Sequence, residues 1–97
     1  MIIVTSPLVV SNGEGGSWHF LTIAADAAAE VRAHSLSSGP RRGFGSVRVE
    51  ARIGDVTWRT SIFPQKSGGY LLPVKAEVRR RAGIAAGDDI TVGLELI

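Results

Sequence analysis

The arginines are the residues of this sequence whose type and spacing point most clearly to chemistry. Arg41 and Arg42 stand between glycines in the segment GPRRGFG (residues 39–45), with Phe44 close behind them. Guanidinium groups bind phosphate or carboxylate through paired hydrogen bonds, and a neighbouring aromatic ring adds a surface for stacking. The segment is therefore a candidate anion site. The alternative, which the sequence leaves open, is that both arginines simply lie on a solvated loop.

Basic residues gather in the middle of the chain. Residues 41–81 carry ten bases against three acids, a net charge of +7, whereas residues 1–40 have a net charge of −2 and residues 82–97 a net charge of −3. This asymmetry favours an anionic partner such as nucleic acid or an acidic protein. The alternative is that the charges only keep a small protein soluble. The candidate anion-binding residues are Arg41, Arg42, Arg48, Arg52, Arg59 and Lys66.

Several other kinds of site are disfavoured. The absence of cysteine excludes disulfides, thiolate metal sites and a cysteine nucleophile. Neither His19 nor His34 has a partner at metal-ligand spacing, and the adjacent Asp88 and Asp89 suit a turn. The sequence also lacks a G-x-S-x-G motif and a P-loop. We therefore predict no metal, no cofactor and no catalytic residue, and the sequence favours a non-enzymatic protein without deciding the question.

Two alternating segments in the middle of the chain predict a β-hairpin. Apolar residues alternate with polar or charged ones in residues 46–53 and again in residues 56–63. Residues 54–55, a Gly-Asp pair, fit a two-residue turn between them. One face of the hairpin should be buried and the other exposed, with Arg59 meeting Glu50 or an arginine across the pair.

The C-terminal quarter of the chain predicts a strand, a short helix and a second strand. Pro73 suits the first turn of a helix, where its missing N–H costs no hydrogen bond. Gly83 should end this helix in the left-handed conformation of a Schellman motif. The arginines of its last turn should complement the helix dipole, and Glu77 should pair with Arg80 or Arg81.

A similar unit is predicted in the first half of the chain. Residues 18–23 form an aromatic and β-branched strand, and a helix follows with Asp26 as its N-cap. The tetrapeptide AEVR occurs at residues 29–32 and again at residues 76–79, each time in a helix that follows a strand. Two similar β-plus-helix halves would together give a β-barrel or split barrel, mostly β, that is capped by two short α-helices.

The aromatic residues define a second candidate site. Trp18 and Trp58 both fall in predicted strands, where packing at the ends of the barrel core is the expected role of a tryptophan. If one end of the barrel is open, Trp18, His19 and Lys66 would instead border a small pocket. The candidate pocket residues are Trp18, His19, Phe44 and Trp58.

Two resemblances to known families strengthen the barrel prediction. The segment LLPVKAEVRRRAGIAAGDDITVGLEL resembles the strand–helix–strand core of AbrB-like regulators and MazE-like antitoxins. Over nearly the whole chain, GGSWHFLTI, PRRGFGSVRVEARIGDVTWRTSIFP and GGYLLPVKAEVRRRAGIAAGDDITVGLEL are similar to the bacterial family known as domain of unknown function 1905. That resemblance implies a double-split (AbrB-like) β-barrel made by one chain, and it implies no established activity. It does not carry over DNA binding, because the DNA-contacting basic positions of AbrB-like proteins are not matched residue by residue in this sequence.

Length and composition set the remaining expectations. Ninety-seven residues correspond to one domain, residues 1–97, and 44% hydrophobic residues suffice for a core. No apolar run approaches the ~20 residues of a membrane span, and the N-terminus lacks the basic start of a secretory signal. We therefore expect a soluble, cytoplasmic protein without membrane contact, either a monomer or a homodimer.

Our main functional expectation is a small binding or regulatory domain, without enzymatic activity, that contacts an anionic partner through a basic face. One alternative is a small-molecule-binding or catalytic barrel with a pocket at one barrel end. The other alternative is an AbrB- or MazE-like nucleic-acid-binding or antitoxin-type interaction module.

Overall fold

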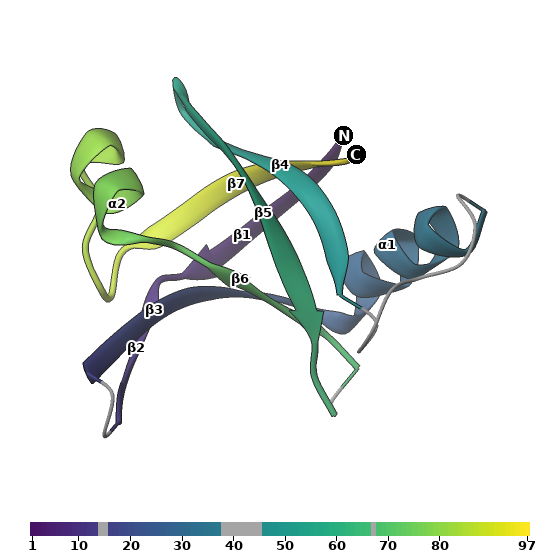
Figure 1. Ribbon diagram of the computed structural model, residues 1–97, viewed down its shortest axis with the longest axis horizontal. Helices are drawn as coiled ribbons and strands as arrows, with labels where there is room; N and C mark the ends of the chain where they lie inside the picture. The colour runs from purple at the N-terminus through teal and green to yellow at the C-terminus, as the bar shows by residue number, and fades with distance from the viewer. Residues whose placement is uncertain (14–15, 38–45, 67) are drawn as a thin grey trace.

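An antiparallel sheet dominates the computed structural model, which describes residues 1–13, 16–37, 46–66 and 68–97 (Figure 1). The sheet has the strand order β1-β7-β4-β5-β6-β3-β2 and curls into a half-barrel. The prediction of a mostly β fold with two short helices is thus confirmed. The elements are β1 (Ile2–Pro7), β2 (Val9–Gly13), β3 (Gly16–Ile23), α1 (Ala25–Ser37), β4 (Val47–Ile53), β5 (Val56–Pro64), β6 (Tyr70–Pro73), α2 (Ala76–Ala82) and β7 (Asp89–Leu96).

The predicted hairpin is confirmed in β4 and β5. Ile53 pairs with Val56 across a two-residue turn, and Gly54 takes a φ of 58° there. A positive φ at this position suits glycine because it has no Cβ to collide with the backbone. Alternate apolar residues point into the core, namely Val47, Val49, Ala51 and Ile53 of β4 and Val56, Trp58 and Ile62 of β5, and the arginines point outward. This alternation gives the hairpin the wet outer face that the sequence predicts.

Corresponding strands of the two halves pair with one another. The strands that precede the helices, β3 and β6, are antiparallel partners, and so are β4 and β7, which follow the helices. β5 pairs with both β4 and β6, while β1 and β2 pair with β7 and β3 respectively. Only Leu8 separates β1 from β2, and its N–H donates to Asp88 O at 2.9 Å. The pairing scheme of the first half is therefore repeated in the second.

The core lies inside the curl of the sheet, and the two helices lie at opposite ends of it (Figure 1). α1 packs against β1 and β7 through the fully buried Ala28 and Val31, and Arg32 Nη1 donates to Gly68 O at 2.8 Å. α2 packs beside β5 and buries Val78. Within the part of the chain that the structure describes, neither helix is long and apolar enough to cross a membrane.

Both predicted helix starts are wrong. Pro73 is the last residue of β6 rather than the first turn of α2, and the residue after it, Val74, still donates its N–H to His19 O on β3 at 3.0 Å. α1 begins one residue before Asp26, whose Oδ1 accepts from the N–H of Ala27 at 3.0 Å in the first turn. The negative charge of Asp26 therefore interacts favourably with the positive N-terminal end of the helix dipole, but Asp26 is not the N-cap.

The predicted end of α2 is confirmed. Gly83 has φ 68° and ψ 36°, the left-handed conformation. Ile84 N–H donates to Arg79 O at 3.1 Å, and Gly83 N–H donates to Arg80 O at 3.3 Å. This pair of hydrogen bonds defines the Schellman motif, which satisfies the last carbonyls of the helix. It turns the chain sharply enough for β7 to return to the sheet.

Candidate functional site

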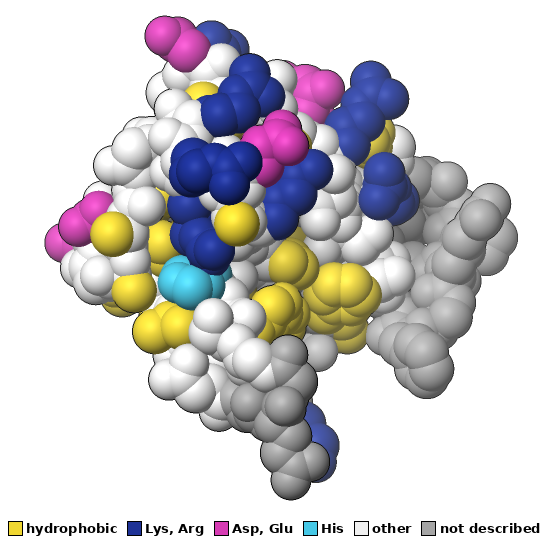
Figure 2. Space-filling view, turned by 60° about the vertical axis from the view of Figure 1, so that its left-hand side comes forward, with side chains coloured by type: hydrophobic (Ala, Val, Ile, Leu, Met, Phe, Trp, Pro, Cys, Tyr) yellow, Lys and Arg dark blue, Asp and Glu magenta, His cyan; other side chains and the backbone are white. Residues whose placement is uncertain are grey.

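The outward surface of β4, β5 and α2 is rich in cations. Residues directly opposite one another in an antiparallel pair lie on the same side of the sheet, and β4–β5 places Arg48, Arg52 and Arg59 together on the outside. α2 lies beside β5 and adds its own cations (Figure 2). We call this surface the basic face, and it consists of Arg48, Arg52, Arg59, Lys75, Arg79, Arg80 and Arg81.

Carboxylates neutralise only part of the basic face. Arg59 Nε lies 3.5 Å from Glu50 Oε2, and Arg81 Nη1 lies 3.8 Å from Glu77 Oε1. These are the ion pairs found among the described residues, and both are exposed, so each is worth little to stability. Glu95 stands opposite Glu50 in the register of β4 and β7. The other cations of the basic face have no carboxylate partner in the described part of the chain.

Two of these unpaired arginines are held by neutral hydrogen bonds. Arg48 Nη1 donates to Ser61 Oγ at 3.4 Å, and Arg52 Nε donates to Gly54 O at 3.0 Å. A guanidinium has five N–H donors in a planar fork, so each group keeps several donors that point toward solvent. The hydrogen bonds orient the side chains while leaving them able to bind an anion.

Exposed and half-buried apolar side chains continue the outward surface beyond the basic face. The register of β2, β3, β6 and β5 places them side by side, with Phe63 opposite Leu71 and Phe20 opposite both Pro73 and Val9. Figure 2 shows such a band of hydrophobic side chains directly below the Lys and Arg side chains. We call the apolar residues that this register aligns on the outward side the apolar row, and they are Val9, Trp18, Phe20, Phe63, Leu71 and Pro73.

Two aromatic members of the apolar row, Trp18 and Phe63, are exposed, and the third, Phe20, is half-buried. Trp18 is 45% exposed and Phe63 is 43% exposed, and the ring centroids of Trp18 and Phe20 lie 5.1 Å apart with a 44° tilt. The expectation that Trp18 packs in the core is wrong, because Trp18 occupies the outward phase of β3. Trp58 occupies the inward phase of β5 and does lie in the core, 9% exposed.

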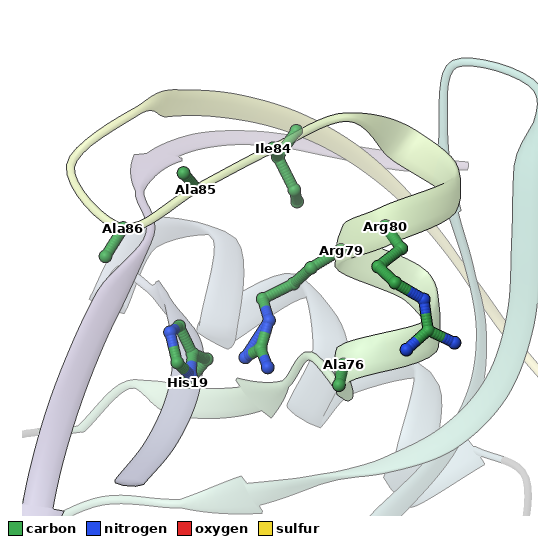
Figure 3. Close-up of a pocket in the computed structure, with 7 residues that line it drawn as sticks. All are labelled: His19, Ala76, Arg79, Arg80, Ile84, Ala85 and Ala86. Carbon is green, nitrogen blue, oxygen red and sulfur yellow. The ribbon is translucent and has the colours of Figure 1, made fainter.

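A shallow groove of about 410 Å³ opens between β3, α2 and the connection from α2 to β7 (Figure 3). His19 contributes from β3, and Arg79 and Arg80 contribute from α2. The side chain of Arg79 extends toward His19, while that of Arg80 points away from it. The remaining lining residues are alanines and Ile84. The groove therefore combines apolar walls with cationic donors and has no carboxylate or hydroxyl among its lining residues.

The groove depresses the pKa of His19 below its ordinary value of 6.5. Partial burial of the imidazole is the larger cause, because it disfavours the charged form, and the positive charge of Arg79 adds to it. At neutral pH the imidazole is therefore neutral beside a permanent cation. A bound anion would reverse this balance by favouring protonated His19.

The structure separates the residues that the sequence proposed as sites. Arg48, Arg52 and Arg59 share the basic face, and His19 lines the groove. Lys66 comes two residues after the end of β5 and is not part of the basic face, of which Arg48 is nearest along β5 because it stands opposite Ser61. Trp58 lies in the core. The predicted Arg41, Arg42 and Phe44 lie outside the described residues.

Sequence reasoning missed two groups of surface residues. The sequence predicts that the helix arginines complement the helix dipole and pair with Glu77, whereas α2 also places Arg79 and Arg80 at the groove. The sequence prediction does not include the apolar row, because it favours core packing for Trp18 and assigns no role to Phe20. A usable signal was present, since both residues share one phase of β3 and Phe63 shares the phase of Arg59 in β5.

These features define the class of protein: a mostly β domain with two helices and a basic outer face. The chain belongs to the family described as domain of unknown function (DUF1905), which it matches over residues 5–94. A comparison with curated proteins gives no significant match.

Proposed function

We propose that this domain binds an anionic partner through the basic face and has no catalytic role. The observation that supports the proposal is a contiguous outward surface whose cations outnumber the carboxylates that pair with them. Arginine suits such a role because its planar donors match phosphate and carboxylate oxygens in pairs. A non-catalytic role is favoured because His19 faces Arg79 rather than a carboxylate or hydroxyl partner in the groove.

The proposal is tested by the salt dependence of binding to a polyanion. Fluorescence anisotropy with labelled random-sequence DNA, single-stranded and duplex, measures the affinity at several salt concentrations. Each phosphate that the protein neutralises releases counterions, so the logarithm of the binding constant falls linearly with the logarithm of the salt concentration. The slope is about −0.9 for each phosphate contact with a duplex and about −0.7 for each contact with a single strand. Steep salt dependence supports the proposal, and no binding at low salt would overturn it.

A double substitution locates the contact on the protein. Arg48→Gln with Arg52→Gln removes two charges that have no carboxylate partner, so no acid is left unpaired. We expect weaker binding and a salt slope that is smaller by about two contacts. Lys66→Gln is the comparison variant, because it removes a single charge outside the basic face and should change the slope by less than the double substitution does. Circular dichroism verifies that each variant is folded.

The pairing scheme also supports a proposal about architecture. We infer that residues 1–97 form one double-split barrel, in which β1–β2, β3, α1 and β4 correspond to β5, β6, α2 and β7. The antiparallel pairs β3–β6 and β4–β7 are what a local twofold relation between the halves requires. The repeat of AEVR in α1 and α2 agrees with it. A circular permutant opened between β4 and β5, with the natural termini joined, should then fold. A permutant that stays unfolded would contradict this relation.

A second candidate function is favoured by the groove. A small phosphate- or carboxylate-bearing ligand would find Arg79 and His19 side by side within it. Titration with inorganic phosphate, followed by NMR of the imidazole, should raise the pKa of His19, because the anion stabilises the protonated ring. Arg79→Gln should abolish this response. An unchanged His19 pKa at saturating phosphate would exclude the groove as an anion site.

A further inference from the structure

We propose that the apolar row is a base-stacking platform and that the anionic partner is single-stranded nucleic acid. This inference rests on the proposed function, because the phosphates would bind the basic face. Trp18 and Phe63 present exposed rings on the same outward surface as the arginines. Proteins that bind single strands combine a cationic groove for the backbone with aromatic side chains on which bases stack.

The basic face and the apolar row share strand β5. Arg59, Ser61 and Phe63 lie on its outward side, each about 7 Å from the next along an extended strand. Arg48 stands opposite Ser61 and donates a hydrogen bond to it. An extended strand of nucleic acid that crosses β5 would therefore meet guanidinium donors on one side and an aromatic ring on the other.

The row then continues across the sheet toward Trp18. Phe63 adjoins Leu71, and the next pairs along are Phe20 with Pro73 and Phe20 with Val9. Neighbouring strands are ~4.8 Å apart, so Phe63 and Phe20 lie roughly 10 Å apart in the direction across the strands. Trp18 adds a third ring in contact with Phe20. Three rings on one surface can accept successive bases of the same strand.

The row favours a single strand over a duplex. In a duplex the faces of the bases are already stacked on each other, and only their edges are accessible in the grooves. Exposed rings on a sheet surface can stack only on bases that are unpaired and splayed out. The duplex would use the basic face alone, which predicts weaker binding than for a single strand of equal length.

The experiment compares alanine variants by fluorescence anisotropy with labelled oligothymidylate of about 12 nucleotides, a length within the range that such sites cover. Trp18→Ala and Phe63→Ala should each weaken binding by about tenfold or more. Ile3→Ala is the control, because Ile3 is 60% exposed on β1 and lies outside the row. It should leave the affinity unchanged, and all three variants should keep the circular dichroism spectrum of the parent.

Tryptophan fluorescence gives an independent readout of stacking. Trp58 is buried in the core while Trp18 is exposed, so a stacked base should quench Trp18 selectively. We expect the emission to fall on titration with oligothymidylate and to stay constant in the Trp18→Phe variant. Unlabelled duplex of the same length should quench less and compete at least tenfold less effectively.

The outcomes separate this inference from the proposed function. Equal affinities for single strand, duplex and heparin, with no loss in the alanine variants, would overturn the stacking platform and leave the basic face as a general anion surface. Absence of binding to every polyanion would overturn both proposals. A stable dimer in sedimentation that Phe63→Ala dissociates would also overturn the platform, because a second copy would then cover the row.

Discussion

Substitution of Gly83 offers the sharpest test of how the fold positions α2. The residue has φ 68° and ψ 36°, and a Cβ built on it meets no heavy atom within 4 Å. Replacement therefore creates no clash with neighbours, and the whole cost comes from the left-handed backbone, about 1–2 kcal/mol for a residue with a side chain. Since a domain of this size loses about 4–8 °C of Tm per kcal/mol, Gly83→Ala should lower Tm by at least about 4 °C.

Several substitutions at Gly83 can be compared with one another, so that the order of their Tm values tests the left-handed conformation. Gly83→Val should lower Tm further than Gly83→Ala, because left-handed φ values are least tolerated by β-branched residues. Gly83→Asn should lower it least, since asparagine enters this region most readily. Ala85→Val is a matched control at an exposed position without a positive φ. Thermal unfolding by circular dichroism measures all four, and an unchanged Tm for Gly83→Val would refute the left-handed helix stop.

Three further perturbations probe the core and the groove. Tyr70→Phe should leave Tm unchanged or raise it, because the buried hydroxyl has no hydrogen-bond partner among the described residues; a fall of several degrees would reveal a partner. Gly69→Ala should prevent stable folding or lower Tm strongly, because its Cβ would overlap the carbonyl oxygen of Ile23; a parent-like Tm would contradict this packing. Arg79→Gln should raise the pKa of His19 in an NMR titration, but only in part, since burial is the larger cause of its depression. The depressed pKa means that the unfolded chain binds the proton more readily, so stability should fall as pH drops below about 6.5, and Arg79→Gln should reduce this fall.

The hairpin of β4 and β5 was predictable from the sequence because its alternation has a period of two on both sides of a Gly-Asp turn. The stop of α2 was predictable for a similar local reason, since Gly83 marks the left-handed position that few other residues accept. The two helix starts were not predictable in this way. Pro73 fits a strand end as well as a helix start, and the pairing of β6 with β3 decides between them.

Part of the candidate site was likewise predictable from the sequence, and part was not. The outward arginines of β4 and β5 followed from strand alternation, because one phase was apolar and the other charged. The exposure of Trp18 did not follow from its residue type, since tryptophans on strands usually pack in cores. The sequence places Trp18 and Phe20 on one phase of β3, and the burial of Leu21 and Ile23 on the other phase shows that the aromatic phase faces outward. The approach of Arg79 to His19 depends on tertiary packing between segments about 60 residues apart in sequence.

Chemical-shift mapping with oligothymidylate tests the central claim most directly, because it reports where a single strand touches the protein. We expect the largest shifts at the indole N–H of Trp18, at Phe63 and at the side-chain N–H groups of Arg48 and Arg59, with little change in α1. The shifts should shrink as salt is added. Shifts concentrated on α1, or no shifts at low salt, would contradict the account.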